Sequence, residues 1–330
     1  MSNRLVKIET TKDEKILDIR WDPSNTCNFK CRYCDPINHN GTFKSPTDVN
    51  LIVDNFSYML DQYKSKLHKE KIRLTIAGGE PTLWKDLGVF VSKIKDRNDV
   101  YLSVVSNGSR TLRWWTQNGH LIDNLTMTLH INEADIAHSI AVADIMYELG
   151  CKTTVKVMMD PLEWHKCVNA VETMKQQSNK KWFILVAKVI GFEDYTTEQL
   201  DYLKDSLKRM PPISWFWKNR SLVLNGLIKK YESVATFDDL SKTNATSFMY
   251  INNDLNYFNG WSCNLGLENI YIGYSGELKG SCSQQLYNGN MNILDKDFVK
   301  KFNLDITPVT CTQQSCNCAP ENHISKFSFS

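Results

Sequence analysis

The sequence predicts an α/β fold, namely a partial (β/α)6 TIM-type barrel followed by a small Cys-rich C-terminal domain. Short β-branched runs alternate with longer helix-like stretches between about residues 15 and 190. Eight of the 10 cysteines fall into two groups near the two ends of the chain. With 330 residues, 42% of them hydrophobic and 23% charged, the chain can bury a large core.

Six strands are expected, each rich in β-branched or aromatic residues. They cover Ile16–Trp21, Ile72–Ala77, Val100–Val105, Leu125–Leu129, Thr153–Met159 and Trp182–Val189. Strands in strict alternation with helices are joined by right-handed crossovers, and the resulting parallel sheet curls toward a barrel. Because a complete barrel of this type has eight strands, six indicate a barrel that is open on one side.

Six helices are expected between and after these strands. They cover Thr47–Leu67, Lys85–Lys95, Thr111–Gly119, Glu133–Leu149, Leu162–Gln177 and Thr197–Lys208. Ser45-Pro46 and Asp160-Pro161 are typical helix starts, and Gly150 suits a helix end.

Composition divides the chain into four parts. We expect an N-terminal segment over 1–14, the barrel over 15–210, a connector over 211–260 and the Cys-rich domain over 261–330. The aromatic stretch around Trp215 is interpreted as packing of the connector on the barrel. The last part is rich in Gly, Cys and Asn, so we expect a metal to stabilise it.

Charge and hydropathy indicate a cytoplasmic protein. Lys+Arg of 39 against Asp+Glu of 37 gives a net charge of +2, so no global field favours nucleic acid or an anionic membrane as a partner. No apolar run is long enough for a signal peptide or a membrane span. In a reducing compartment, clustered cysteines suggest metal ligation or catalysis, whereas the isolated Cys151 and Cys167 suit the core.

The first cysteine group follows the first expected strand with the spacing CxxxCxxC, at Cys27, Cys31 and Cys34. Loops at this end of barrel strands build active sites. Three thiolates can hold three irons of a cubic cluster and leave the fourth iron for another ligand. The alternative is a zinc site, in which His39 supplies a fourth ligand.

With Tyr33 at the aromatic position, this loop resembles the radical SAM superfamily motif CxxxCx(aromatic)C. The resemblance implies a 4Fe-4S cluster on the three cysteines, with S-adenosylmethionine (SAM) chelated to the fourth iron. It also implies Tyr33 as part of the SAM site. Reductive cleavage of SAM then gives methionine and a 5'-deoxyadenosyl radical, which abstracts hydrogen from a substrate.

A second motif, Gly78-Gly79-Glu80, directly follows the second expected strand. Adjacent glycines let backbone groups approach a ligand, and a carboxylate can fix an ammonium group. The resemblance implies that this motif holds the methionine amino group of SAM.

The ends of the next two strands carry further polar residues. Ser106 and Asn107 close the third strand, and the resemblance implies contacts with the SAM ribose. His130 ends the fourth strand, where SAM contact, substrate contact and a structural role remain open. Further candidates for the substrate side of the barrel mouth are Asp35, Asn38, Glu133, Asp160 and Lys188.

The second cysteine group begins with Cys263 and Cys282, which an expected hairpin brings close, and continues with Cys311, Cys316 and Cys318. It resembles the SPASM and shorter twitch domains that follow some radical SAM barrels. The resemblance implies one auxiliary 4Fe-4S cluster on Cys263, Cys282 and two of the last three cysteines. A structural zinc is the alternative.

Together these features predict a radical SAM enzyme of oxidoreductase, isomerase or transferase type. An electron donor such as flavodoxin or ferredoxin is the expected partner, and no membrane is involved. Fold and cofactor motifs do not fix the substrate, so three classes stay open: a small metabolite, a modified nucleobase or a peptide. The alternatives are a ribosomal-peptide maturase with a separate peptide-binding partner, and a zinc-stabilised binding module without enzymatic activity.

Overall fold

The computed structural model describes residues 3–179, 181–189, 195–208, 233–245, 250, 253–280, 282, 286–287, 291–316 and 324–328. The chain divides into two compact units. The first unit comprises Met1–Trp21, Asn50–Leu74 and Ser221–Ser330, and the second comprises Asp22–Val49 and Thr75–Arg220. The expected packing role of Trp215 lies outside the described residues.

The second unit is built on four parallel strands. They are β4 (Val100–Ser106), β5 (Asn124–Leu129), β6 (Lys152–Met159) and β7 (Phe183–Lys188), paired in this order. Its helices are α2 (Leu87–Lys95), α3 (Leu112–Asn118), α4 (Ile136–Glu148), α5 (Trp164–Ser178) and α6 (Thr197–Lys208). Four 3-10 turns complete it: η1 (Pro36–Asn38), η2 (Pro81–Leu83), η3 (Gly119–Leu121) and η4 (Pro161–Glu163).

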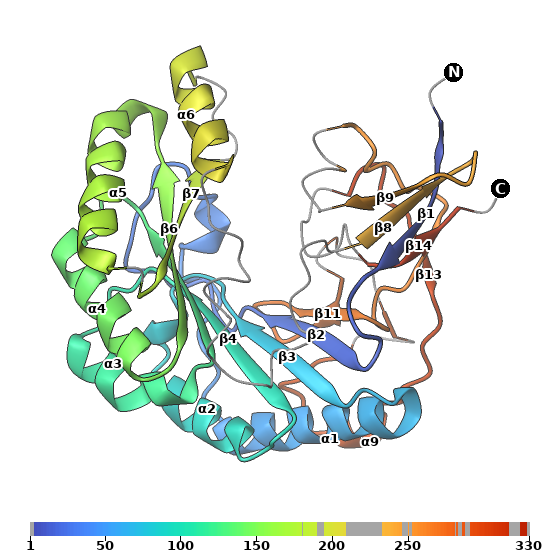
Figure 1. Ribbon diagram of the computed structural model, residues 1–330. Coiled ribbons are helices and arrows are strands. Elements are labelled where there is room, and N and C mark those ends of the chain that lie inside the picture. The colour runs from blue at the N-terminus through green and yellow to red at the C-terminus, as the bar shows by residue number, and fades with distance from the viewer. Residues whose placement is uncertain are drawn as a thin grey trace. The chain divides into compact units, whose positions relative to one another are not determined.

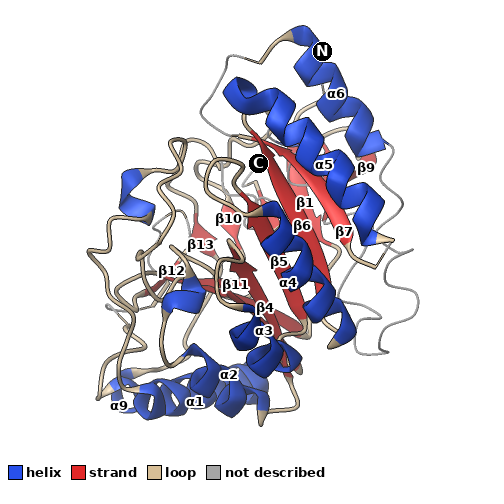
Figure 2. Ribbon diagram, turned by 90° about the vertical axis from the view of Figure 1, so that its left-hand side faces the viewer, coloured by secondary structure: helices blue, strands red, loops and turns tan. Residues whose placement is uncertain are grey.

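The two faces of these strands differ in burial. On β5, Leu125, Met127 and Leu129 are fully buried, whereas Thr126 and Thr128 are partly exposed. Helices α3, α4 and α5 lie along one face of β4 to β7 in both views (Figures 1 and 2). The alternation therefore separates an apolar face that supports the helices from a face that carries polar side chains.

The first unit contains two groups of paired strands. A six-stranded sheet has the order β13-β10-β14-β1-β8-β9. Its strands are β1 (Leu5–Thr10), β8 (Ser233–Phe237), β9 (Lys242–Ala245), β10 (Ser262–Cys263), β13 (Val309–Thr310) and β14 (Lys326–Phe327). Separately, β2 (Ile16–Trp21) pairs in parallel with β11 (Asn269–Ile272), which pairs antiparallel with β12 (Leu278–Lys279).

The remaining elements of the first unit lie around these strands. Helix α1 (Val49–Leu67) lies beside the short helix α9 (Phe298–Lys301) in Figures 1 and 2. The ring of Tyr58 on α1 meets that of Phe302 edge-on, with centroids 6.3 Å apart. Strand β3 (Lys71–Ile76) begins in the first unit, and its last two residues belong to the second.

A buried carboxylate on β2 bonds to the preceding loop and to β3 within the first unit. Asp18 is 8% exposed and accepts hydrogen bonds from Lys12 Nζ at 3.1 Å and Arg73 Nη2 at 2.5 Å. Burial alone would raise the pKa of Asp18, but the two cations outweigh it and lower that pKa to about 2.

The structure confirms the predicted order of elements. The six expected strands are β2 to β7, and the six expected helices are α1 to α6. Helix α4 starts three residues later than expected, because Asp135 caps it by accepting a hydrogen bond from the His138 amide. Glu133 therefore lies in a turn before the helix. Strand β1 was not expected; it lies in the segment 1–14.

The two isolated cysteines lie in the core. Cys151 and Cys167 are 2% and 0% exposed, which confirms their interpretation as core residues. Among the helices of the described residues, none is long and apolar enough to cross a bilayer.

Candidate functional site

The three cysteines of the first group lie on the loop that follows β2, in the second unit, and all are partly exposed. Partial burial raises the pKa of all three thiols. For Cys31 the pKa rises to about 12, first through burial and then through the charges of Cys27, Glu133 and Cys34. Three neighbouring thiolates therefore need a positive group among them, which iron ions would supply.

A 4Fe-4S cluster and a single zinc ion place different demands on these thiols. Within the described residues, no three His, Cys, Asp or Glu side chains meet closely enough to hold one metal ion. In a 4Fe-4S cluster each cysteine ligates a different iron, so the sulfurs surround a cube. His39, the fourth ligand of the zinc alternative, belongs to no such group in that part of the chain.

Asn25 holds together the loop that carries Cys27, Cys31 and Cys34, here called the cysteine loop. Its side chain is fully buried and donates hydrogen bonds to Ile37 O at 2.7 Å and Asn40 Oδ1 at 2.8 Å. Its Oδ1 accepts from the Phe43 amide at 2.8 Å. The sequence reading missed this residue, although an amide just before Cys27 can serve as donor and acceptor at once.

The glycine motif packs directly on the backbone that precedes Cys27. The Gly79 amide donates to Ser24 O at 3.0 Å, and the Glu80 amide donates to Thr26 O at 2.7 Å. A Cβ atom on Gly79 would lie 2.3 Å from Thr26 O. Gly78 has a φ of 113°, and its Cβ would lie 2.6 Å from Ser24 O. Close backbone approach therefore requires glycine at both positions.

Glu80 joins this motif to the end of β4. Its carboxylate is fully buried and accepts hydrogen bonds from Ser106 Oγ at 2.8 Å and the Asn107 amide at 2.6 Å. It also accepts from the Thr82 amide at 3.0 Å, and burial raises the pKa of Glu80. Binding of an ammonium group by Glu80 stays a prediction; in the structure its oxygens hold two loops together.

Asn107 connects the end of β4 to the cysteine loop. Its Nδ2 donates to Asn28 Oδ1 at 3.1 Å and lies 3.8 Å from Cys27 Sγ. Because Glu80 also bonds to Ser106 and Asn107, the three predicted motifs meet next to Cys27.

Tyr33 and His130 are also brought together. The Tyr33 hydroxyl lies 2.8 Å from His130 Nδ1. Burial, with a smaller contribution from the charge of Lys156, lowers the pKa of His130 to about 4. The imidazole is therefore neutral at neutral pH, and the Tyr33 hydroxyl can donate to it.

Lys156 is a site residue that the sequence reading missed. It lies on β6 directly across from Thr128 of β5, two residues before His130. Thr154, Lys156 and Met158 are partly exposed, whereas Val155 and Val157 are fully buried. The alternation of side chains along the predicted strand could have indicated Lys156, because it places this lysine on the face of the sheet that the helices do not cover.

Asp160, a candidate for the substrate side, pairs with the cysteine loop. Arg32 forms a two-pronged ion pair with the buried Asp160 carboxylate, in which Nε lies 3.0 Å from Oδ2. Asp160 Oδ1 also caps η4 by accepting from the Leu162 amide at 3.0 Å. The end of β6 thus anchors the loop between Cys31 and Cys34.

The other substrate-side candidates have varied surroundings. The Asp35 carboxylate caps η1 through the Ile37 amide at 3.0 Å. A hydrogen bond from Asn38 lowers the pKa of Cys34, against the larger effect of burial. Glu133 is exposed, and the exposed Lys188 places its ammonium 5.1 Å from the centre of the Tyr195 ring. Their roles toward a substrate stay predictions.

The second cysteine group converges in the first unit. The expected hairpin forms from β11 and β12, with Gly276 in its turn at a φ of 87°. One pocket is lined by Cys263, Cys282, Cys311 and Cys316, together with Leu265, Val309, Gln313 and Lys326. Cys318 lies outside the described residues.

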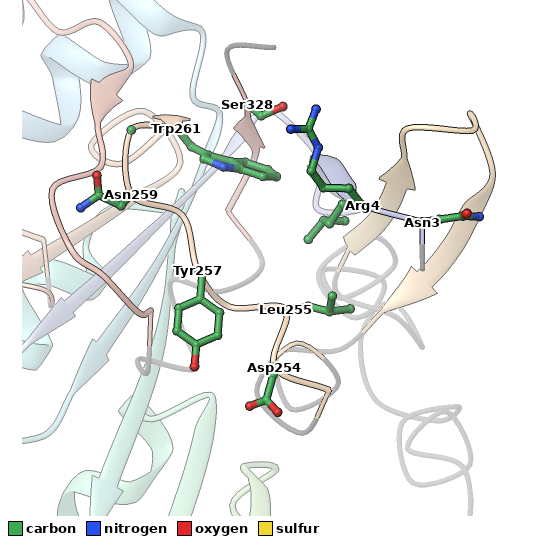
Figure 3. Close-up of a pocket in the computed structure, with 10 residues that line it drawn as sticks. Asn3, Arg4, Asp254, Leu255, Tyr257, Asn259, Trp261 and Ser328 are labelled. Carbon is green, nitrogen blue, oxygen red and sulfur yellow. The ribbon is translucent and has the colours of Figure 1, made fainter. Parts of the chain in front are cut away.

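Another cavity of the first unit, of about 510 Å³, has a different lining. Figure 3 shows Tyr257 and Trp261 on one segment of its wall and Arg4 on another. It contains none of the predicted site residues.

Sequence comparison places the first three motifs in one family model. Residues 21–132 match the Radical SAM superfamily. The GTP 3',8-cyclase of Campylobacter jejuni subsp. doylei is 37% identical over 103 residues, which are 29% of each chain. The probable GTP 3',8-cyclase of Sulfurisphaera tokodaii is 26% identical over 186 residues, or 54% of each. The chain thus matches about 29% of the length of the first of these relatives.

Solved structures resemble the chain over most of its length. Native anSMEcpe with bound AdoMet has a TM-score of 0.53 at 15% identity, covering 87% of this chain and 81% of that one. Streptococcus suis SuiB bound to precursor peptide SuiA has a TM-score of 0.51 at 13% identity, covering 86% and 64%. At these identities the likeness shows the fold, and it agrees with the predicted partial barrel.

Proposed function

We propose that this chain, whose residues 21–132 match the Radical SAM superfamily, is an enzyme that reductively cleaves S-adenosylmethionine and removes a hydrogen atom from a substrate. The observation that supports this most is the meeting of three motifs at Cys27. Both the glycine motif and Asn107 contact the backbone or sulfur of the loop that carries Cys27, Cys31 and Cys34.

Each part of the site has its own task in this proposal. The three thiolates hold a 4Fe-4S cluster which, with SAM bound, supplies the 5'-deoxyadenosyl radical. Gly78 and Gly79 keep the neighbouring backbone close to the cysteine loop, and Glu80 holds Ser106 and Asn107 in place. Tyr33 packs against the neutral His130, which directly follows β5.

The test is anaerobic reconstitution with iron and sulfide, followed by addition of dithionite and SAM. We expect brown protein and the formation of 5'-deoxyadenosine. A variant with Cys27, Cys31 and Cys34 all replaced by Ala should form none. Colourless protein that binds zinc at these cysteines would refute the proposal in favour of a zinc-stabilised binding module.

We propose further that the pocket of the first unit holds one auxiliary 4Fe-4S cluster. Its support is the convergence of Cys263, Cys282, Cys311 and Cys316 on one pocket of the described residues. Iron retained by the variant without Cys27, Cys31 and Cys34 would support this cluster. Zinc retained there instead would contradict it.

For the substrate, one observation favours a nucleotide. The relatives are named GTP 3',8-cyclases, and Lys156 gives the polar face of β5 and β6 a positive charge that suits a phosphate. Incubation with GTP, SAM and dithionite should then consume GTP together with SAM. Unchanged GTP would contradict this assignment.

A peptide is the second candidate, because two of the similar structures are complexes with one. These are anSMEcpe with the Kp18Cys peptide and SuiB with precursor peptide SuiA. For this candidate we propose a peptide maturase that uses a separate peptide-binding partner. In either case a flavodoxin or ferredoxin supplies the electron, and the reducing cytoplasm suits the cysteine ligands.

A further inference from the structure

Lys326 is a buried cation in the wall of the four-cysteine pocket. It lies on β14, is 1% exposed, and lines the pocket together with Cys263, Cys282, Cys311 and Cys316. In the antiparallel pair of β10 and β14, Lys326 stands directly across from Cys263. Side chains of directly opposed residues lie on the same face of a sheet, with Cβ atoms about 4.5–5.5 Å apart.

The surroundings of Lys326 hold its ammonium in place. Its Nζ lies 5.1 Å from the centre of the Phe258 ring and donates to Ile324 O at 3.3 Å. Burying a charge is costly unless opposite charge lies near it. The thiolates of the four cysteines that share this pocket can provide that opposite charge.

A cluster held by four thiolates has a net negative charge, and reduction adds one more electron to it. Net charge, hydrogen bonds and solvent exposure set the reduction potential of such clusters. At a buried site, the attraction between a cation and the added electron is weakly screened. A fixed positive charge therefore favours the reduced form and raises the potential.

We propose that Lys326 raises the reduction potential of the auxiliary cluster through its buried positive charge. This inference rests on the proposed auxiliary cluster. Lys326 acts through the cysteine ligands, as a positioning and tuning residue.

The experiment uses the full chain with Cys27, Cys31 and Cys34 replaced by Ala, so that only the auxiliary cluster remains. In this background, Lys326→Met removes the charge and keeps an unbranched apolar side chain, whereas Lys326→Arg keeps the charge. Each protein is reconstituted anaerobically and titrated with dithionite, while electron paramagnetic resonance follows the reduced cluster.

Lys7→Met is the matched control. Lys7 lies on the neighbouring strand β1, and its ammonium also faces a phenyl ring, that of Phe327, at 5.3 Å. Its side chain is 38% exposed and pairs with Glu9 at 2.8 Å, so solvent screens its charge.

We expect Lys326→Met to lower the midpoint potential, and Lys326→Arg and Lys7→Met to leave it close to that of the background protein. An unchanged potential in Lys326→Met, at equal iron content, would overturn the tuning role. If Lys326→Met does not retain iron, Lys326→Arg decides: loss of the cluster there as well would show that packing, and not charge, is what Lys326 provides. No iron in the background protein itself would instead refute the auxiliary cluster.

Discussion

Replacing Gly79 by Ala should separate the glycine motif from the cysteine loop. The added Cβ would lie 2.3 Å from Thr26 O and 2.7 Å from Thr26 C, and both are backbone atoms. To restore ordinary contact, this backbone has to retreat by about 1 Å. Such a shift strains the bonds from Gly79 N to Ser24 O and from Glu80 N to Thr26 O. Losing both costs about 1–3 kcal/mol.

The assay is urea unfolding of the protein without iron, together with iron content after reconstitution. We expect Gly79→Ala to lower the unfolding midpoint and to reduce the iron held by Cys27, Cys31 and Cys34. Gly273→Ala is the control, because its Cβ would lie 3.3 Å from the flexible end of Lys279 and at an ordinary contact distance of 3.7 Å from Tyr271 Cε1. Wild-type stability and iron content in Gly79→Ala would refute the reasoning that close backbone approach requires glycine.

Two further predictions concern buried carboxylates. Asp160→Asn keeps an oxygen that can cap η4 but loses the negative charge opposite Arg32, whose side chain is 34% exposed. We expect the free energy of unfolding to fall by about 1 kcal/mol and the reconstituted protein to retain less iron. An unchanged free energy of unfolding and iron content would contradict the anchoring role of Asp160. The pKa of Asp18 is lowered to about 2 in the folded protein, below its unfolded value near 3.8. The Asp18 carboxylate therefore contributes about 2 kcal/mol to the free energy of unfolding above pH 3.8, and this contribution is lost as the pH falls toward 2. Unfolding of Asp18→Asn between pH 5 and pH 2 should therefore depend less on pH than unfolding of the wild type, and equal slopes would contradict this.

Periodicity and turn residues predicted most of the fold. The alternation of β-branched runs with helical stretches predicted β2 to β7 and α1 to α6 in order. It missed the strand pair β1 and β8, in which Ile8 stands across from Ala235. This pairing joins residues far apart in the chain, so no local pattern indicates it.

The site was predictable where its residues form motifs. Cys27 was found from the spacing of its cysteine group, and Glu80 and Asn107 from motifs at strand ends that resemble those of the radical SAM superfamily; the structure brings the three residues together. Asn25 and Lys156 were missed, because the importance of each depends on what lies across from it. Asn25 bonds to the far end of its own loop, and Lys156 stands across from Thr128 of another strand.

Glu80 has contacts that its motif does not indicate. Binding of an ammonium group by Glu80 stays a prediction, and its oxygens also accept from Thr82, Ser106 and Asn107. Burial favours such internal bonding, since an unsatisfied carboxylate would be costly. A sequence names the residue types at a site, and only the packed structure shows what each side chain contacts.

The most direct test of the account compares the wild type with the variant that lacks Cys27, Cys31 and Cys34, both anaerobic and reduced, by quantifying 5'-deoxyadenosine formed from SAM. We predict that the wild type forms 5'-deoxyadenosine and that the variant forms none while it keeps the iron of the auxiliary cluster. Formation at the wild-type rate by the variant would contradict the central claim that these three thiolates hold the cluster that cleaves SAM.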